Sequence, residues 1–174
     1  AINSLGMIQD IAFIDINKDG FEDLICTGHW MGISIYYGSK SKVFEEAKTI
    51  SNDITGWFNS VEITDLNNDG LLDILVGNEG MNNKFRASSE HPLSVYLNDF
   101  DNSGTQDVVL VKASGDMSVP VRGKDCSTEQ LPMLATKFDS YEEFASSSVD
   151  QIYSSEALEA SYYAEVNEFR HGIF

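Results

Sequence analysis

A nine-residue pattern that occurs three times constrains the fold of this chain more than any other feature. Aspartate stands at its first and ninth places, glycine at the sixth, and aspartate, asparagine or serine at the third and fifth. The copies begin at Asp15, Asp65 and Asp99, and short apolar runs precede and follow them. Because glycine tolerates the positive φ of a tight loop, each copy predicts a loop between two β-strands.

The spacing of the oxygen-bearing side chains in these loops favours calcium. Calcium takes about six to eight oxygen ligands at roughly 2.3–2.6 Å, largely from carboxylates and carbonyls. Alternate side chains of a tight loop can turn toward one centre, and the seventh residue can offer its backbone carbonyl. Carboxylates gathered without a cation would repel one another. The loops therefore predict up to three calcium ions, with the third site the weakest because Ser103 is a poorer ligand than aspartate.

The same opening residues also occur in EF-hands and in simple hairpin turns. An EF-hand needs glutamate at the twelfth place and a helix on each side. Cys26 and Val76 occupy that place in the first two loops and lie in apolar runs typical of strands, which excludes the EF-hand. Asp-Gly and Ser-Gly mark simple hairpin turns. A single copy would leave a simple turn open, but three copies with a shared ninth-place aspartate favour calcium.

The acidic composition limits the classes of partner. The 174 residues suffice for one ordinary domain with a real core, and the formal net charge is −17. Nine aspartates of the 28 acidic residues lie in the three loops. Such a chain is a poor candidate for binding nucleic acid or an anionic membrane, and it has no apolar run long enough to span a bilayer. No signal-peptide pattern follows Ala1, as expected of a processed or excised fragment.

The two cysteines are too few to indicate a disulfide scaffold. Cys26 lies in an apolar run and is predicted to be a small core residue. A disulfide between Cys26 and Cys126 is the less favoured alternative, because sequence alone does not bring their Cα atoms together.

Apolar runs predict short antiparallel strands around each loop. The glycine-bounded segment 28–32 is expected to turn, and no closing strand is expected at Phe174. The predicted strands span residues 7–14, 23–27, 33–37, 59–64, 73–77, 93–98, 118–121 and 162–169, with an outer edge strand around 43–44 and 49–50.

These strands predict a mainly β fold of propeller-type blades, a partial propeller in this chain, with a small helical insertion. The predicted helices cover 128–134, 140–145 and 149–160, and Ser140 with Glu143 forms a capping box at the second. One domain is expected over 1–174, divided into blade one at about 1–55, blade two at about 56–92, a third calcium-loop unit at about 93–124, the helical insertion at about 125–160 and a returning strand at about 161–174.

The pattern Asp-x-Asn-x-Asp-Gly-x-x-Asp-Leu, followed by a short strand, resembles the FG-GAP/VCBS repeat that also builds the integrin α-subunit propeller. Segments 28–31, 77–85 and 121–126 are similar to segments of large secreted bacterial VCBS-repeat proteins. The resemblance covers almost the whole chain. It implies an extracellular β-propeller in which calcium clamps the loop between the first two strands of a blade.

The resemblance also implies a set of calcium ligands when it is carried over by position. The seventh residue of each loop would contribute its carbonyl. The implied ligands are Asp15, Asn17, Asp19, Phe21 and Asp23 in the first loop, Asp65, Asn67, Asp69, Leu71 and Asp73 in the second, and Asp99, Asp101, Ser103, Thr105 and Asp107 in the third.

No catalytic constellation is visible in the sequence, so enzymatic activity is left open and a non-enzyme is favoured. His29, His91 and His171 lack zinc-site spacing, and neither a Gly-x-Ser-x-Gly elbow nor a phosphate-binding glycine loop occurs. Four aromatic residues fit either a sugar-stacking platform or packing within and between blades, with packing favoured. They are Trp30, Tyr36, Tyr37 and Trp57.

Three functions are consistent with these observations. The leading hypothesis is a non-catalytic, calcium-stabilised module for protein or glycan binding, secreted or on the surface of a bacterial-type cell. The rival is part of a propeller polysaccharide lyase or glycan hydrolase, with His29 or Tyr163 as the base. A structural subunit that assembles through open sheet edges is the third possibility.

Overall fold

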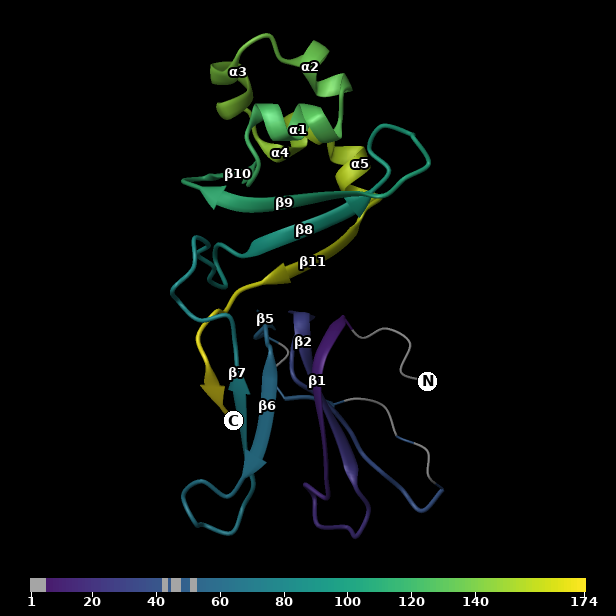
Figure 1. Ribbon diagram of the computed structural model, residues 1–174, viewed down its shortest axis with the longest axis vertical. Coiled ribbons are helices and arrows are strands. Elements are labelled where there is room, and N and C mark those ends of the chain that lie inside the picture. Colours follow the sequence, from purple (N-terminus) through teal and green to yellow (C-terminus); the bar gives the residue numbers. More distant parts are fainter. Residues whose placement is uncertain (1–5, 42–43, 45–47, 51–52) are drawn as a thin grey trace. The chain divides into compact units, whose positions relative to one another are not determined.

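The computed structural model describes residues 6–41, 44, 48–50 and 53–174. The fold is mainly β, with antiparallel strands and, among the described residues, five short helices (Figure 1). The chain divides into two compact units. Unit 1 comprises the residues up to Glu90 together with Val166–Phe174, and unit 2 comprises His91–Glu165.

Unit 1 contains two antiparallel sheets. In the first, the order is β1-β2-β3-β4 and β5 also pairs with β2. In the second, the order is β12-β7-β6. The strands of the first sheet are β1 (Met7–Ile14), β2 (Asp23–Met31), β3 (Ser34–Tyr36), β4 (Lys48–Thr49) and β5 (Gly56–Trp57). Those of the second are β6 (Ser60–Thr64), β7 (Asp73–Gly77) and β12 (Gly172–Ile173).

The two sheets of unit 1 share one hydrophobic core. Ile25 and Ile35 of the first sheet are buried in the same cluster as Val61, Ile74 and Val76 of the second. Because side chains of a strand alternate between faces, each sheet contributes every second residue to this core. The loop after β1 and the loop after β6 emerge at the same end of unit 1 (Figure 1).

Unit 2 is a four-stranded sheet with helices on one face (Figure 1). Its strand order is β10-β9-β8-β11, formed by β8 (Leu93–Asn98), β9 (Asp107–Ser114), β10 (Met117–Pro120) and β11 (Tyr162–Val166). The helices are α1 (Lys124–Gln130), α2 (Met133–Lys137), α3 (Tyr141–Ala145), α4 (Val149–Tyr153) and α5 (Ser155–Glu159). They follow β10 and precede β11, which confirms a helical insertion between strands. Val109 and Val111 pack in one core with Leu131, Leu134 and Ile152.

Three strand predictions are confirmed to the residue, namely 7–14, 73–77 and 93–98. The turn predicted at 28–32 is wrong, because β2 continues to Met31. Gly28 is not a turn residue here. A Cβ on it would lie 2.1 Å from the Met7 carbonyl oxygen, so glycine allows β1 to approach β2 closely. The pairing register shifts between Ile8 and Asp10, directly opposite, as at a β-bulge.

Two helix predictions are wrong in their bounds. The helix predicted at 128–134 is replaced by α1 and α2, because Leu131 precedes Pro132 and adopts a non-helical φ of −125°. The helix predicted at 149–160 is interrupted at Ser154, whose φ is 68°. The predicted edge strand is present as β4, while residues 42–43 and 45–47 lie outside the described part of the chain.

Other expectations concern caps, the final strand and the cysteines. The Ser140 hydroxyl accepts the Glu143 N–H at 3.1 Å, but the Glu143 carboxylate accepts from Asp139, so the predicted capping box is half formed. A closing strand does occur, since β12 pairs with β7. Cys26 is buried as predicted, and both cysteines are free thiols. Among the described residues, no helix is long and apolar enough to cross a bilayer.

Candidate metal centre

The three predicted loops share one backbone conformation. The sixth-place glycines Gly20, Gly70 and Gly104 have φ of 92°, 85° and 85°. The fourth-place residues also lie in the left-handed region, at 59° for Lys18, 60° for Asn68 and 58° for Asn102. Since glycine and asparagine tolerate this region best, the pattern specifies two left-handed positions two residues apart. This turns the chain sharply enough to bring alternate side chains to one side.

The first-place aspartate organises each loop through hydrogen bonds to the backbone. Asp15 accepts the N–H of Asp19 at 3.0 Å and that of Gly20 at 2.8 Å. Asp65 does the same in the second loop at 3.1 and 2.9 Å, and Asp99 in the third at 2.8 Å for both. Each carboxylate therefore faces inward, in a position dictated by the fifth and sixth backbone donors.

The third and fifth side chains continue the same arrangement. Asn17 and Asn67 accept the fifth-place N–H at 3.0 and 2.8 Å, and Asp101 accepts that of Ser103 at 3.1 Å. Asp19 and Asp69 in turn accept the seventh-place N–H, at 2.9 and 2.8 Å. Ser103 Oγ accepts the Thr105 N–H at 3.3 Å in the third loop. The side-chain oxygen atoms at places one, three and five thus accept equivalent backbone N–H groups in all three loops.

The ninth-place aspartate ties the outgoing strand back to the start of the loop. One oxygen accepts the second-place N–H in every loop, from Ile16 at 2.9 Å, Leu66 at 2.9 Å and Phe100 at 3.1 Å. Asp23 is fully buried, and its other oxygen accepts the Gly38 N–H at 2.8 Å. Backbone donors therefore position the last predicted ligand as well as the first.

In unit 2 a side chain takes the supporting role that Gly38 has in unit 1. Gln130, the last residue of α1, donates its amide N–H to Asp107 Oδ1 at 3.2 Å. Arg122 in turn donates to the Gln130 amide oxygen at 2.9 Å, which fixes the orientation of that amide. The helical insertion of unit 2 is thereby connected to its loop.

The third loop gathers three carboxylates at a separation that suits a cation. Oxygen atoms of Asp99, Asp101 and Asp107 all lie within 4.8 Å of one another. Two ligands of one calcium ion, each at roughly 2.3–2.6 Å, are separated by no more than about 5 Å. This acidic triad can therefore hold a metal ion.

The first two loops differ from the third at the third place. In the first two loops an amide, Asn17 or Asn67, replaces the third-place carboxylate, and its Nδ2 donates to the fifth-place aspartate at 3.0 and 2.9 Å. The seventh-place side chains point to solvent: Phe21 is 38% and Leu71 is 66% exposed, and Thr105 is also exposed. Only their backbone can serve the loop.

The aromatic residues singled out in the sequence pack together in unit 1. The Trp57 ring lies 5.3 Å from Trp30, 5.4 Å from Phe85 and 5.3 Å from Phe169, measured between centroids. Phe169 is 2% exposed. Tyr36 is buried in a neighbouring cluster, and Tyr37 packs against the shared core. These contacts favour packing over a sugar-stacking platform.

The two bases named for the rival function are both engaged in hydrogen bonds. His29 lies in β2, and its Nε2 is 2.8 Å from Asn59 Oδ1. Tyr163 donates a short hydrogen bond to the Glu165 carboxylate and lies 3.2 Å from Ser94 Oγ. Burial, followed by the bond to Glu165, raises the pKa of Tyr163 to about 12. A phenol that holds its proton so firmly is a poor general base near neutral pH.

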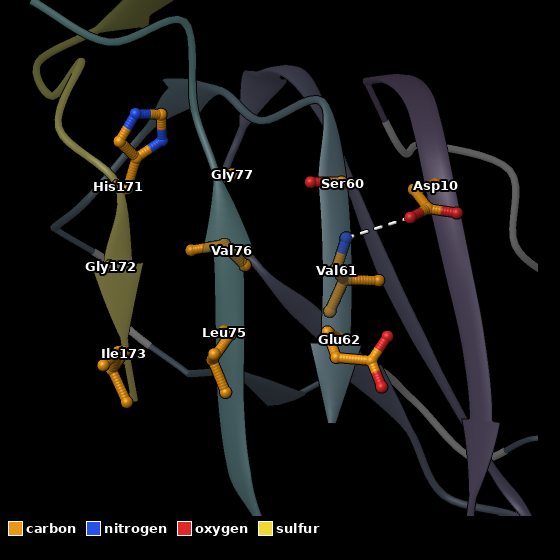
Figure 2. Close-up of a pocket in the computed structure, with 10 residues that line it drawn as sticks. All are labelled: Asp10, Ser60, Val61, Glu62, Leu75, Val76, Gly77, His171, Gly172 and Ile173. Atoms are coloured by element: carbon orange, nitrogen blue, oxygen red, sulfur yellow. Dashed lines mark hydrogen bonds between the residues drawn. The ribbon is translucent and has the colours of Figure 1, made fainter. Parts of the chain in front are cut away.

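A pocket of unit 1 lies away from the loops, along β6, β7 and β12 (Figure 2). Asp10 lines one side of it and accepts the Val61 N–H at 2.9 Å, which joins β1 to β6. His171 lines the other side, and its Nδ1 accepts the Asn78 N–H at 3.0 Å. The Asp10 carboxylate and the His171 Nδ1 atom therefore each bind a backbone N–H group beside the pocket.

Two contributors to the loops were missed in the sequence. Gln130 supports the third loop from a helix, and Lys18 Nζ reaches from the first loop to the Gly70 carbonyl of the second, at 2.6 Å. Neither contact has a sequence signal, because each depends on tertiary placement. The left-handed fourth position did have a sequence signal, since asparagine occupies it as Asn68 and Asn102.

Comparison with known proteins supports the interpretation of the loops as a repeat. Residues 15–76 match the family described as the FG-GAP-like repeat. The match begins at the first place of the first loop and ends in β7, so it spans both loops of unit 1. No curated protein and no solved structure matches the chain.

Proposed function

We propose that this chain is a calcium-stabilised module for protein or glycan recognition outside the cell. Its residues 15–76 match an FG-GAP-like repeat, a type of repeat that suggests a β-propeller-like module. The observation that carries the proposal is the equivalent backbone and hydrogen-bond arrangement of the three loops. In each loop the first-place aspartate accepts the sixth-place glycine N–H, and in the third loop three carboxylates lie within 4.8 Å of one another.

The donor set favours calcium over other divalent ions. Carboxylate, amide and carbonyl oxygens suit hard cations, whereas zinc and copper prefer the imidazole and thiolate ligands that these loops lack. Magnesium demands octahedral geometry at about 2.0–2.1 Å and keeps several waters, while calcium accepts irregular sets of protein oxygens. The proposed ligands are the fifteen positions given above, and bound calcium would neutralise charge that otherwise repels within each loop.

Thermal denaturation tests the calcium part of the proposal. Calcium at about 10 times the Kd of a site stabilises the folded state by about 1.4 kcal/mol per site, and 1 kcal/mol shifts the Tm of a chain of this size by about 2–4 °C. We therefore expect millimolar calcium to raise the Tm well above that measured in EDTA, with a smaller rise in magnesium. An unchanged Tm would contradict structural calcium.

Extracellular placement is supported by the same chemistry. Weak calcium sites, with Kd of about 10⁻⁴–10⁻³ M, are typical of extracellular modules, where calcium is abundant. The recognition role is tested by screening the calcium-loaded protein against immobilised glycans and candidate surface proteins. Binding lost in EDTA supports it, and light scattering on the same sample distinguishes a partner complex from self-assembly through sheet edges.

The rival enzymatic function has its own test. A polysaccharide lyase releases unsaturated products that absorb ultraviolet light. Incubation with a panel of acidic polysaccharides in calcium would reveal such products. Substitution Tyr163→Phe would abolish them only if this phenol, despite its raised pKa, serves as the base.

A further inference from the structure

The two loops of unit 1 are joined by a lysine. Lys18 lies at the fourth place of the first loop, and its ammonium group donates to the Gly70 carbonyl oxygen of the second loop at 2.6 Å. The two residues are 52 positions apart in the chain. Figure 1 shows both loops at the same end of unit 1. The contact therefore connects the tip of one loop to the tip of the other.

The contact places an exposed ammonium group against the backbone of the second loop, between two proposed ligands. Gly70 stands between Asp69, a proposed ligand, and Leu71, the proposed carbonyl ligand. Gly70 N–H is itself held by Asp65 at 2.9 Å. The lysine thus binds the backbone segment on which three proposed ligands depend.

The other two loops show that a lysine is not needed for the loop conformation. Asn68 and Asn102 occupy the same place with φ of 60° and 58°, against 59° for Lys18. Asparagine satisfies the left-handed backbone without a charge. The local turn therefore does not explain why a lysine stands at this place.

We infer that Lys18 is an internal counter-cation that couples the first two loops. In the calcium-free protein, its ammonium group replaces part of the positive charge that the ion would supply at the second loop. This inference rests on the proposed calcium sites. A fixed ammonium group lowers the mutual repulsion of the second-loop carboxylates when no calcium is bound. The same ammonium group opposes the arrival of a second cation, so it weakens calcium binding there.

Lys18→Asn should therefore change two properties in opposite directions. This variant keeps the loop conformation, because it copies the residue of the other loops. In EDTA it should unfold at a lower temperature than the wild type. In a calcium titration followed by calorimetry, the second loop should bind calcium about two- to five-fold more tightly, the range expected for one exposed charge. If the contact only held the two loops together, Lys18→Asn would lower both the melting temperature in EDTA and the calcium affinity of the second loop.

Three controls make the test specific. Lys112→Met removes an exposed lysine from β9 of unit 2, with the same change in net charge, and should leave both properties unchanged. Lys18→Arg retains the charge and should behave as the wild type. In an Asp69→Asn background, where the second loop has lost a proposed ligand, the binding step that Lys18→Asn strengthens should disappear from the titration.

The outcomes separate this inference from the proposed function. Calcium binding by the wild type with an unchanged or weakened affinity in Lys18→Asn would overturn the counter-cation role and leave calcium binding intact. If the wild type binds no calcium, the proposed sites fail, and the inference fails with them. An increase of the same size in Lys112→Met would attribute the effect to overall charge and would also overturn the inference.

Discussion

Unit 1 and unit 2 hold the same loop in different surroundings. The loop at Asp15 is supported by backbone groups of unit 1, including the Gly38 N–H after β3, and its ninth residue Asp23 is fully buried. The loop at Asp99 is supported by the Gln130 side chain of a helix. The hydrogen bonds within the two loops are nevertheless equivalent. The local sequence thus determines the loop conformation. The tertiary contacts determine how much free energy of unfolding is lost when a loop residue is replaced.

Substitution of the ninth-place aspartate should give the largest difference between the two units. Asp23→Ala leaves the half-buried N–H groups of Ile16 and Gly38 without an acceptor, at about 1–3 kcal/mol each. We expect a loss of about 3 kcal/mol in the free energy of unfolding, measured by urea denaturation in EDTA. Asp107→Ala should lose less, because its second oxygen accepts only the longer bond from the Gln130 side chain. Equal losses at the two positions would remove the distinction between the units.

Substitution of the sixth-place glycine should affect the two units equally. Gly20→Ala and Gly104→Ala place a Cβ at φ of 92° and 85°, where nothing else lies within 4 Å, so the cost is conformational. That cost is about 1–2 kcal/mol for a residue other than glycine. Because the two loops share this conformation, urea denaturation should give equal losses for the two variants. A clear difference between the two losses would refute the local origin of the effect.

Tyr163 of unit 2 should contribute to the loss of stability at high pH. The pKa of Tyr163 is raised from 10.0 to about 12, so its protonated form stabilises the fold below pH 10, and this contribution is lost as pH rises through 12. Because the residue is 45% exposed, solvent screening limits the effect to about 1 kcal/mol. Denaturation of the wild type and Tyr163→Phe between pH 8 and pH 12 measures it. A difference that does not shrink with rising pH would contradict the assignment.

Loss of the helix-borne support should have the smallest effect. Gln130→Ala removes a hydrogen bond of 3.2 Å to Asp107, with an expected cost of about 0.5 kcal/mol. In calcium, the third loop should weaken about two-fold while the first two loops remain unchanged. Thr128→Ala on the same helix serves as a control, since its hydroxyl bonds the Asp125 carbonyl within the helix. Weakening of all three loops would show that the helix acts on the fold as a whole.

The sequence predicts the loops well because they are local. Residue type, spacing and glycine position specify the turn, so the strands that enter and leave it are found to the residue in β1, β7 and β8. The acidic triad of the third loop contains Asp101 at the place where the other loops have asparagine. That loop therefore has three aspartates, as the other two loops do, although serine replaces aspartate at its fifth place.

The features that the sequence did not reveal depend on contacts between distant residues. Gly28 is of a residue type that favours turns, but the close approach of β1 is the reason for a glycine at this position. Asn78 is another case. Its Nδ2 donates to the carbonyl oxygens of Glu168 and Arg170, and its N–H donates to His171 Nδ1, which holds the final segment within unit 1. The two-residue strand β12 forms in that segment, and two residues carry no periodicity from which to predict it.

Native mass spectrometry of the chain in millimolar calcium tests the central claim most directly. If the three loops are equivalent cation sites, the wild type binds three calcium ions. Asp19→Asn, Asp69→Asn and Asp101→Asn then bind two each, because each variant weakens one loop. A chain that binds no calcium, or variants that retain the stoichiometry of the wild type, would contradict the account.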